Sequence, residues 1–108
     1  MPKFGLSDKS IKQIQDILRK HPEIEQAIIY GSRAMGNYRE GSDIDLTLKG
    51  EKVTQDIRGK VWLDLDDSYS PYLFDISVYH LLTNPDFIAQ IDQFGQVFYQ
   101  RENNNEKL

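Results

Sequence analysis

The segment 24–49, IEQAIIYGSRAMGNYREGSDIDLTLK, decides the fold of this 108-residue chain. Its first part, 24–30, is rich in β-branched and aromatic residues and ends at Gly31, which predicts a largely buried strand followed by a turn. A short helical turn and a polar, glycine-rich connection follow. Apolar residues then alternate with polar ones over 43–49, which predicts a half-buried strand. The two predicted strands therefore flank a loop that begins with Gly31 and Ser32.

Two stretches on either side of this segment have the spacing of amphipathic helices. Isoleucine and leucine at helical spacing predict a first helix that begins after Ser7 or Ser10 and runs to about Lys20. Pro22 ends it, because the residue before a proline is pushed out of the helical region. Apolar residues four apart predict a second long helix over 53–66.

The last third of the chain predicts a strand, a helix and a short closing strand. Apolar and polar residues alternate over 73–80, as they do in a half-buried strand. The tripeptide Asn-Pro-Asp at 84–86 is typical of a helix start, and Gly95 stops that helix. After it, 96–100 could add a closing strand.

The order of these elements, α-β-α-β-α-β-α, predicts an α/β (α+β) fold in which helices cover a small mixed sheet. Hydrophobic residues make up 39% of the chain and charged residues 28%, which is the composition of a folded domain rather than of a disordered segment. We expect a single domain over 1–100, because no linker interrupts the chain before a polar C-terminal tail over 101–108.

Composition also excludes several classes of function. The chain has no cysteine, which rules out disulfides, thiolate catalysis and zinc sites built on sulfur, and fits a reducing compartment. No apolar run is long enough to span a membrane and the start lacks the core of a signal peptide, so we expect a cytoplasmic protein without membrane contact. The net charge of −4 argues against direct nucleic-acid binding and leaves room only for a local basic pocket.

Asp43 and Asp45 are separated by one residue on a predicted strand, so both carboxylates lie on one face of it. Two like charges held side by side raise at least one pKa unless a cation neutralises them. Oxygen ligands of this kind suit Mg²⁺, which binds through a few carboxylates and substrate phosphates. For an isolated pair, the alternative interpretation is a solvated strand face.

Asp75 also lies on the polar face of a predicted strand, and a neighbouring position in the sheet would bring it to Asp43 and Asp45. Three carboxylates can hold two Mg²⁺ ions about 4 Å apart, one acting on an attacking hydroxyl and the other on a triphosphate. The third carboxylate is then the natural base. Judged alone, Asp75 could equally be an exposed strand aspartate.

Gly31 and Ser32 follow a predicted strand and precede a short helical turn. Such a turn directs backbone N–H groups and a hydroxyl at whatever lies over the strand end, which favours phosphate. The alternative is an ordinary turn glycine followed by a helix-capping serine.

Gly31-Ser32, ten intervening residues, Asp43-x-Asp45 and a distant strand aspartate form a pattern that resembles the nucleotidyltransferase superfamily with the DNA polymerase β fold. The resemblance is carried first by YGSRAMGNYREGSDIDL and extends over nearly all of the chain. Within that superfamily the short length is similar to that of the minimal nucleotidyltransferases, the antitoxin partners of HEPN-domain toxins.

The resemblance implies phosphate binding by Gly31 and Ser32, and catalysis and metal ligation by Asp43, Asp45 and Asp75. It also adds Arg33 to the nucleotide-binding residues, as a charge near the triphosphate. One residue departs from the family pattern Gly-Ser-x-Ala-Arg-Gly: Met35 stands where Arg or Lys is frequent. Arg33, Arg39 or Lys49 could compensate for the missing charge.

The function that the resemblance implies is Mg²⁺-dependent transfer of AMP from ATP to a tyrosine hydroxyl of a HEPN-type ribonuclease toxin, which silences the toxin. Two ions, ATP and a heteromeric complex with the toxin are expected. A non-catalytic antitoxin that neutralises the toxin by binding is the first alternative. The second is a nucleotidyltransferase subunit that acts on a small molecule, or on tRNA ends, with a partner subunit.

Several other side chains have a structural and a functional interpretation. Trp62 is expected in the core, with an interface contact as the alternative. His21 is expected in a turn, and His80 on the surface or as a second base. The loop residues Tyr69, Pro71 and Tyr72 could pack, stack on adenine or meet a partner, and the acidic cluster Asp64, Asp66 and Asp67 could be a solvated helix end or meet a basic partner.

Overall fold

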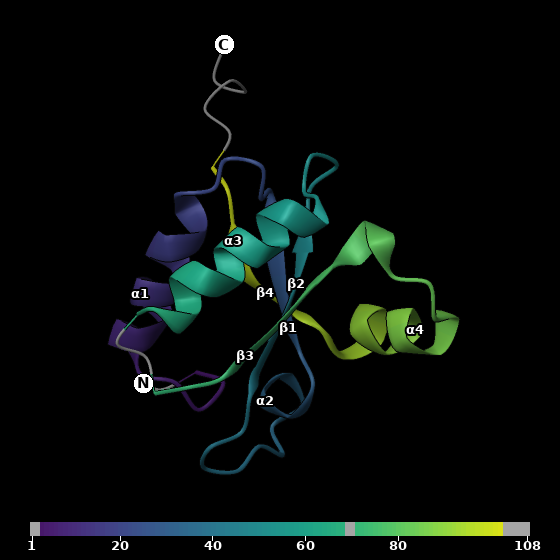
Figure 1. Ribbon diagram of the computed structural model, residues 1–108. Coiled ribbons are helices and arrows are strands. Elements are labelled where there is room, and N and C mark those ends of the chain that lie inside the picture. The colour runs from purple at the N-terminus through teal and green to yellow at the C-terminus, as the bar shows by residue number, and fades with distance from the viewer. Residues whose placement is uncertain (1–2, 69–70, 103–108) are drawn as a thin grey trace.

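The computed structural model describes residues 3–68 and 71–102 (Figure 1). The helices are α1 (Asp8–Arg19), α2 (Ser32–Met35), α3 (Gln55–Asp66) and α4 (Pro85–Phe94), with a 3-10 helix η1 (Tyr79–Leu81). The strands are β1 (Gln26–Tyr30), β2 (Ile44–Lys49), β3 (Phe74–Val78) and β4 (Gln96–Gln100). Within the described residues, no helix has the length and apolar character needed to cross a membrane.

The strands form one mixed sheet in the order β3-β2-β1-β4. β1 runs antiparallel to both of its neighbours, β2 and β4, whereas β2 and β3 are parallel. The small mixed sheet with helices is the predicted fold class, and the closing strand is present. Among the residues that the structure describes, β3 and β4 are the edge strands, so β3 pairs only on its β2 side.

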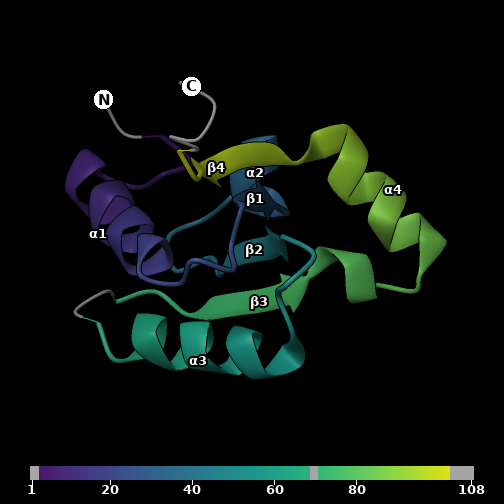
Figure 2. The same cartoon turned by 90° about the horizontal axis from the view of Figure 1, so that it is seen from above.

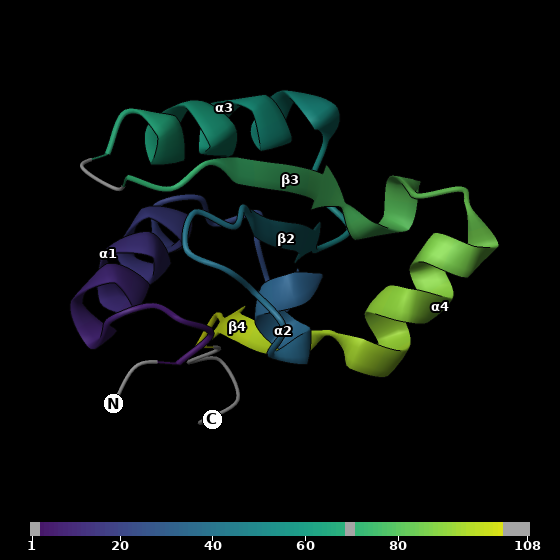
Figure 3. The same cartoon turned by 90° about the horizontal axis from the view of Figure 1, so that it is seen from below.

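The sheet separates α4 from α1 and α3, as Figures 1 and 3 show. On the α1 and α3 side, Ile44, Leu46 and Leu48 of β2 are fully buried in the main core. On the other side Ile28 and Tyr30 form a smaller buried cluster with Ile91 of α4. This second face is only partly covered, and it carries the polar residues of β2 and β3.

Local chemistry explains where the elements begin and end. The Ser7 hydroxyl accepts a hydrogen bond from the Ser10 backbone N–H, so α1 starts after Ser7 rather than after Ser10. Thr54 caps α3 in the same way, which makes the predicted start at residue 53 two residues too early. The predicted strand over 73–80 was too long, because the chain turns into η1 at Tyr79. β1 likewise begins at Gln26, two residues later than predicted.

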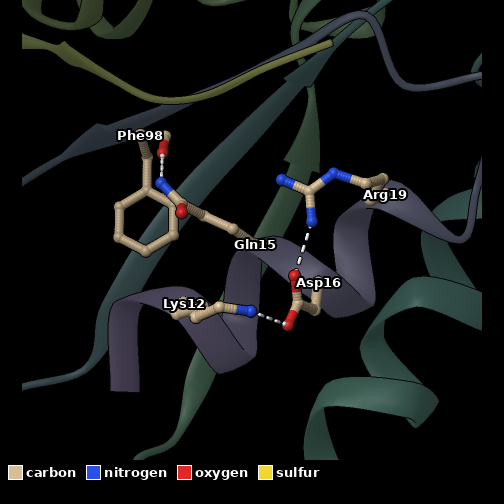
Figure 4. A network of polar contacts seen from close by, with 5 residues as sticks. All are labelled: Lys12, Gln15, Asp16, Arg19 and Phe98. Carbon is tan, nitrogen blue, oxygen red and sulfur yellow. Dashed lines mark hydrogen bonds and ion pairs between the residues drawn. The ribbon is translucent and has the colours of Figure 1, made fainter. Parts of the chain in front are cut away.

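Side chains from two helices cap the outer edges of the sheet. The Gln15 amide of α1 donates to the Phe98 carbonyl of β4 at 2.8 Å (Figure 4). The Trp62 indole N–H of α3 donates to the Phe74 carbonyl of β3 at 3.1 Å. Both bonds satisfy carbonyl groups on edge strands, which would otherwise be open to pairing. The prediction of Trp62 as a core residue was wrong, because its ring lies at the β3 edge and is 36% exposed.

Candidate functional site

The turn after β1 requires glycine for two reasons. Gly31 has φ 75° and ψ −155°, a backbone conformation that side-chain-bearing residues rarely adopt. A Cβ atom at this position would also collide with the carboxylate of Asp45. The turn and the Asp45 carboxylate are therefore packed directly against each other.

Ser32 begins α2 immediately after this turn and is half-buried. The first hydrogen bond of α2 runs from the Met35 N–H to the Gly31 carbonyl at 3.1 Å. The N–H groups of Ser32 and Arg33 precede that bond and take no part in it. The geometry thus provides a hydroxyl and backbone donors at the end of β1, beside Asp45.

The parallel pairing of β2 with β3 brings two of the predicted carboxylates together. Asp45 and Asp75 are direct register partners, so both lie on the partly covered face of the sheet. Asp43 immediately precedes β2 and stands two residues before Asp45, on the same face. Asp43 and Asp75 are exposed, and Asp45 is half-buried. The three carboxylates therefore occupy adjacent positions at one end of the sheet.

Burial raises the pKa of Asp45 from its ordinary value of 3.8 to about 6, and repulsion by Asp75 and Asp43 adds to this effect. The positive charge of Arg33 opposes it by lowering the pKa. The negatively charged form of Asp45 is therefore disfavoured. A bound cation would relieve that repulsion.

The donor set fits Mg²⁺ better than it fits a metal that needs a closed protein cage. Asp43, Asp45 and Asp75 offer only oxygen, the ligand that Mg²⁺ prefers. Within residues 3–68 and 71–102, no three acidic, histidine or cysteine side chains already form a metal-binding group. Mg²⁺ is usually held by one or two carboxylates together with water and substrate phosphates, so substrate oxygens would complete such a site.

Tyr30 is a further residue of the site that the sequence analysis missed. It is the register partner of Asp45 on β1, is 7% exposed and packs edge-on against Phe87 at a centroid distance of 5.4 Å. Burial raises the pKa of Tyr30 to about 12, a hydrogen bond with Ser77 lowers it, and Asp75 and Asp45 raise it further. Tyr30 therefore stays neutral beneath the carboxylates. No pattern within β1 could have identified it, since its position depends on strand register.

Arg33 is placed differently from a residue that awaits a phosphate. It is 3% exposed, and its Nε and Nη2 both donate to the Ser42 carbonyl, at 3.1 and 2.8 Å. Its Nη1 donates to the Phe4 carbonyl at 2.9 Å. The rings of Tyr38 and Tyr72 flank the guanidinium at 5.4 and 5.0 Å. This geometry favours a structural role, anchoring the residue before Asp43, and the contact with a triphosphate stays a prediction.

Met35, which stands where the family pattern has a basic residue, and the basic residues that could compensate for it lie in different places. Met35 is 44% exposed at the end of α2. Arg39 is exposed and lines a cavity of about 330 Å³ together with Arg33. Lys49 ends β2, four residues beyond Asp45, with its Nζ 4.4 Å from the centre of the Tyr79 ring. Lys49 is therefore remote from the carboxylates along the strand.

The other side chains for which the sequence left two interpretations also lie in different places. His21 Nε2 contacts Asp64 Oδ2 at 2.7 Å, which joins the end of α1 to α3. Asp64 therefore has a partner within the protein, and Asp66 and Asp67 are exposed. His80 is exposed in η1. Tyr69, and the part of the predicted tail beyond residue 102, lie outside the described residues.

Comparison with known families identifies the class of protein. Residues 12–104 match the family described as "Polymerase beta, Nucleotidyltransferase". Because the match spans most of the chain, the protein belongs to this nucleotidyltransferase family. No curated protein sequence matches the chain.

Solved structures with the same fold include minimal nucleotidyltransferases in toxin–antitoxin complexes. A crystal structure described as "the toxin-antitoxin with AMP-PNP" has a TM-score of 0.69 and 17% identity, covering 90% of this chain and 78% of that chain. A complex of tri-AMPylated Shewanella oneidensis HEPN toxin with MNT antitoxin has a TM-score of 0.57 and 15% identity, covering 92% and 76%. A putative nucleotidyltransferase from Sulfolobus solfataricus has a TM-score of 0.52 and 18% identity, covering 85% and 78%. The fold of this chain is the polymerase β-like nucleotidyltransferase fold.

Proposed function

We propose that this protein transfers AMP from ATP to a tyrosine hydroxyl of a HEPN-type ribonuclease toxin in a Mg²⁺-dependent reaction, and so acts as the antitoxin. The observation that carries the proposal is the row formed by Asp45 and Asp75 on adjacent strands, with Asp43 beside them and the Gly31 turn against Asp45. This arrangement combines a cation-binding carboxylate group with backbone donors for a triphosphate.

The residues of the chain have distinct tasks in this reaction. Ser32 and the backbone N–H groups at the start of α2 bind the triphosphate. Asp43, Asp45 and Asp75 would hold Mg²⁺, which would supply positive charge against the triphosphate and its leaving group. Asp75, exposed on an edge strand, is open to an incoming acceptor and accepts the proton of its hydroxyl. The hydroxyl oxygen bonds to the α-phosphorus as the bond to pyrophosphate breaks, and pyrophosphate leaves.

The acceptor is proposed by analogy with the structural neighbours. One of them contains AMP-PNP, a nucleotide analogue, and another is a complex with a toxin that carries AMP groups. Both share the fold of this chain at low identity, so the nucleotide and the protein acceptor are proposals for it rather than inherited properties.

The test is coexpression of the chain with a HEPN-domain protein encoded beside its gene, followed by intact-mass measurement of that protein. We expect one or more added AMP groups with the natural chain, and none with Asp75→Asn, because a carboxamide is a poor metal ligand and does not accept the proton. Glu51→Gln, which removes one charge from an exposed turn outside the site, is the matched control. Neutralisation without added mass by both chains would instead establish the non-catalytic antitoxin.

A further inference from the structure

An exposed leucine borders the row of carboxylates. Leu73 is 67% exposed and accepts a hydrogen bond through its carbonyl from the Ile44 N–H at 2.9 Å. This bond continues the parallel register by one residue, which places Leu73 beside Asp43. Leu73 also stands two residues before Asp75, so the two side chains lie on the same face of the sheet. An accessible apolar side chain thus stands between two acidic groups of the site.

A second exposed apolar side chain, Trp62, is held at the outer edge of β3. Trp62 is 36% exposed, and its indole N–H bonds to the carbonyl of Phe74, the residue after Leu73. Figure 2 shows α3 running along β3 at this edge. α3 carries apolar side chains in two directions, because Val61 and Leu65 are buried in the core while Trp62 is exposed. Packing against the core therefore explains Val61 and Leu65, but it does not explain the exposed Trp62 on the outer side of this helix.

Exposed carboxylates lie on two sides of these apolar side chains. Asp66 is one helical turn beyond Trp62 on the same side of α3 and is exposed. Asp43 and Asp75 are exposed on the site side of Leu73. Single exposed apolar residues are common on proteins. Here, however, the two exposed apolar side chains lie at the same edge strand as the row of carboxylates, and this acidic border is complementary to an apolar partner surface with basic side chains around it.

We propose that Leu73 and Trp62 form the docking surface for the partner protein that brings the acceptor hydroxyl to Asp75. The partner surface that fits is apolar at its centre, next to the hydroxyl, and carries lysine or arginine opposite Asp43 and Asp66. This inference rests on the proposed function, in which the acceptor is a protein hydroxyl. The contact explains why a leucine stands exposed beside the acidic groups.

The first test measures binding of the coexpressed HEPN-domain protein to the Leu73→Ser chain. We expect affinity to fall by about tenfold, since truncation of an apolar residue at an interface centre commonly has an effect of this order. Val97→Ser is the matched control, because Val97 is 51% exposed on β4, the opposite edge strand. Binding of a fluorescent ATP analogue with Mg²⁺ should be unchanged in both variants, which separates loss of docking from damage to the site.

The second test uses the single tryptophan of the chain. Labelling this chain with 5-fluorotryptophan gives one ¹⁹F resonance, from position 62, that a partner cannot obscure. We expect the resonance to shift when the HEPN-domain protein is added to the natural chain, and Leu73→Ser to require about tenfold more partner for the same shift.

Equal partner affinity of the Leu73→Ser and natural chains would overturn the proposal, as would a ¹⁹F resonance that the partner leaves in place. A shift that depends on the concentration of the chain alone would also overturn it, since the surface would then bind a second copy. Failure of the proposed function is a separate result. If the natural chain adds no AMP but its binding still depends on Leu73, the docking surface holds and the catalytic proposal falls.

Discussion

The protein is expected to become more stable at neutral pH when Asp45 is replaced by asparagine. The structure raises the pKa of Asp45 from 3.8 to about 6, chiefly by burial and then by repulsion from Asp75 and Asp43. The folded state therefore holds this proton more tightly than the unfolded state. By linkage, ionisation of Asp45 lowers the free energy of unfolding. This loss is absent well below pH 3.8 and grows as the pH rises to about 6.

The size of the effect follows from the pKa difference. A shift of this size corresponds to a ceiling of about 3 kcal/mol, at about 1.4 kcal/mol per pKa unit. Asp45 is only half-buried, so solvent screens part of the repulsion, and we expect about 1–2 kcal/mol in the folded protein. Asparagine has nearly the same shape and no charge, so it should keep the packing against Gly31.

The assay is urea unfolding of the natural chain, Asp45→Asn and Glu51→Gln at a series of pH values, with a chelator present to remove divalent ions. The stability difference between Asp45→Asn and the natural chain should be near zero at about pH 3 and should reach its full value by about pH 7. Glu51→Gln removes the same charge from an exposed turn and should show no such rise. A difference for Asp45→Asn that is zero at neutral pH, or independent of pH, would refute the reasoning.

Three further outcomes test the site. The double variant Asp43→Asn and Asp45→Asn should lose metal-dependent AMP transfer while keeping its circular dichroism spectrum; transfer by the folded variant would contradict the assignment. Ser32→Ala should weaken the use of ATP by about 1–3 kcal/mol, the effect of losing a hydrogen bond to a charged group, measured as the change in kcat/KM; an unchanged value would make the turn purely structural. Gly31→Ala should destabilise the fold by about 1–3 kcal/mol in urea unfolding, through its φ of 75° and the collision with Asp45, and unaltered stability would show that the turn relaxes freely.

Local patterns in the sequence were sufficient to predict the helices and strands and the face of the sheet on which each strand side chain lies. The alternation of Ile44, Leu46 and Leu48 with polar residues put Asp45 on the less covered face, because successive strand residues point to opposite sides. The helix that begins after Asn84 was equally predictable, since capping depends on residues only two or three positions apart.

Strand register was beyond the sequence, and it decided which residues meet at the site. Moving β3 by two residues along β2 would keep every apolar side chain on its face, yet it would pair Asp45 with Leu73 or Ser77 instead of Asp75. The same holds for Tyr30, which lies beside Asp45 only because of the antiparallel pairing of β1 with β2. The alternating pattern repeats every two residues, so it fixes the face but cannot choose among these registers.

The direction of long side chains was also left to the tertiary structure. The sequence position of Arg33 is compatible with a side chain that reaches toward a phosphate. In the structure, carbonyl groups of Ser42 and Phe4, from separate segments, hold its guanidinium in the interior. Trp62 follows the apolar stripe of α3 in sequence, but its indole N–H finds an acceptor at the β3 edge and keeps the ring at the surface. Sequence spacing determines which side of an element a residue occupies, whereas hydrogen-bond partners distant in the chain determine what that residue touches.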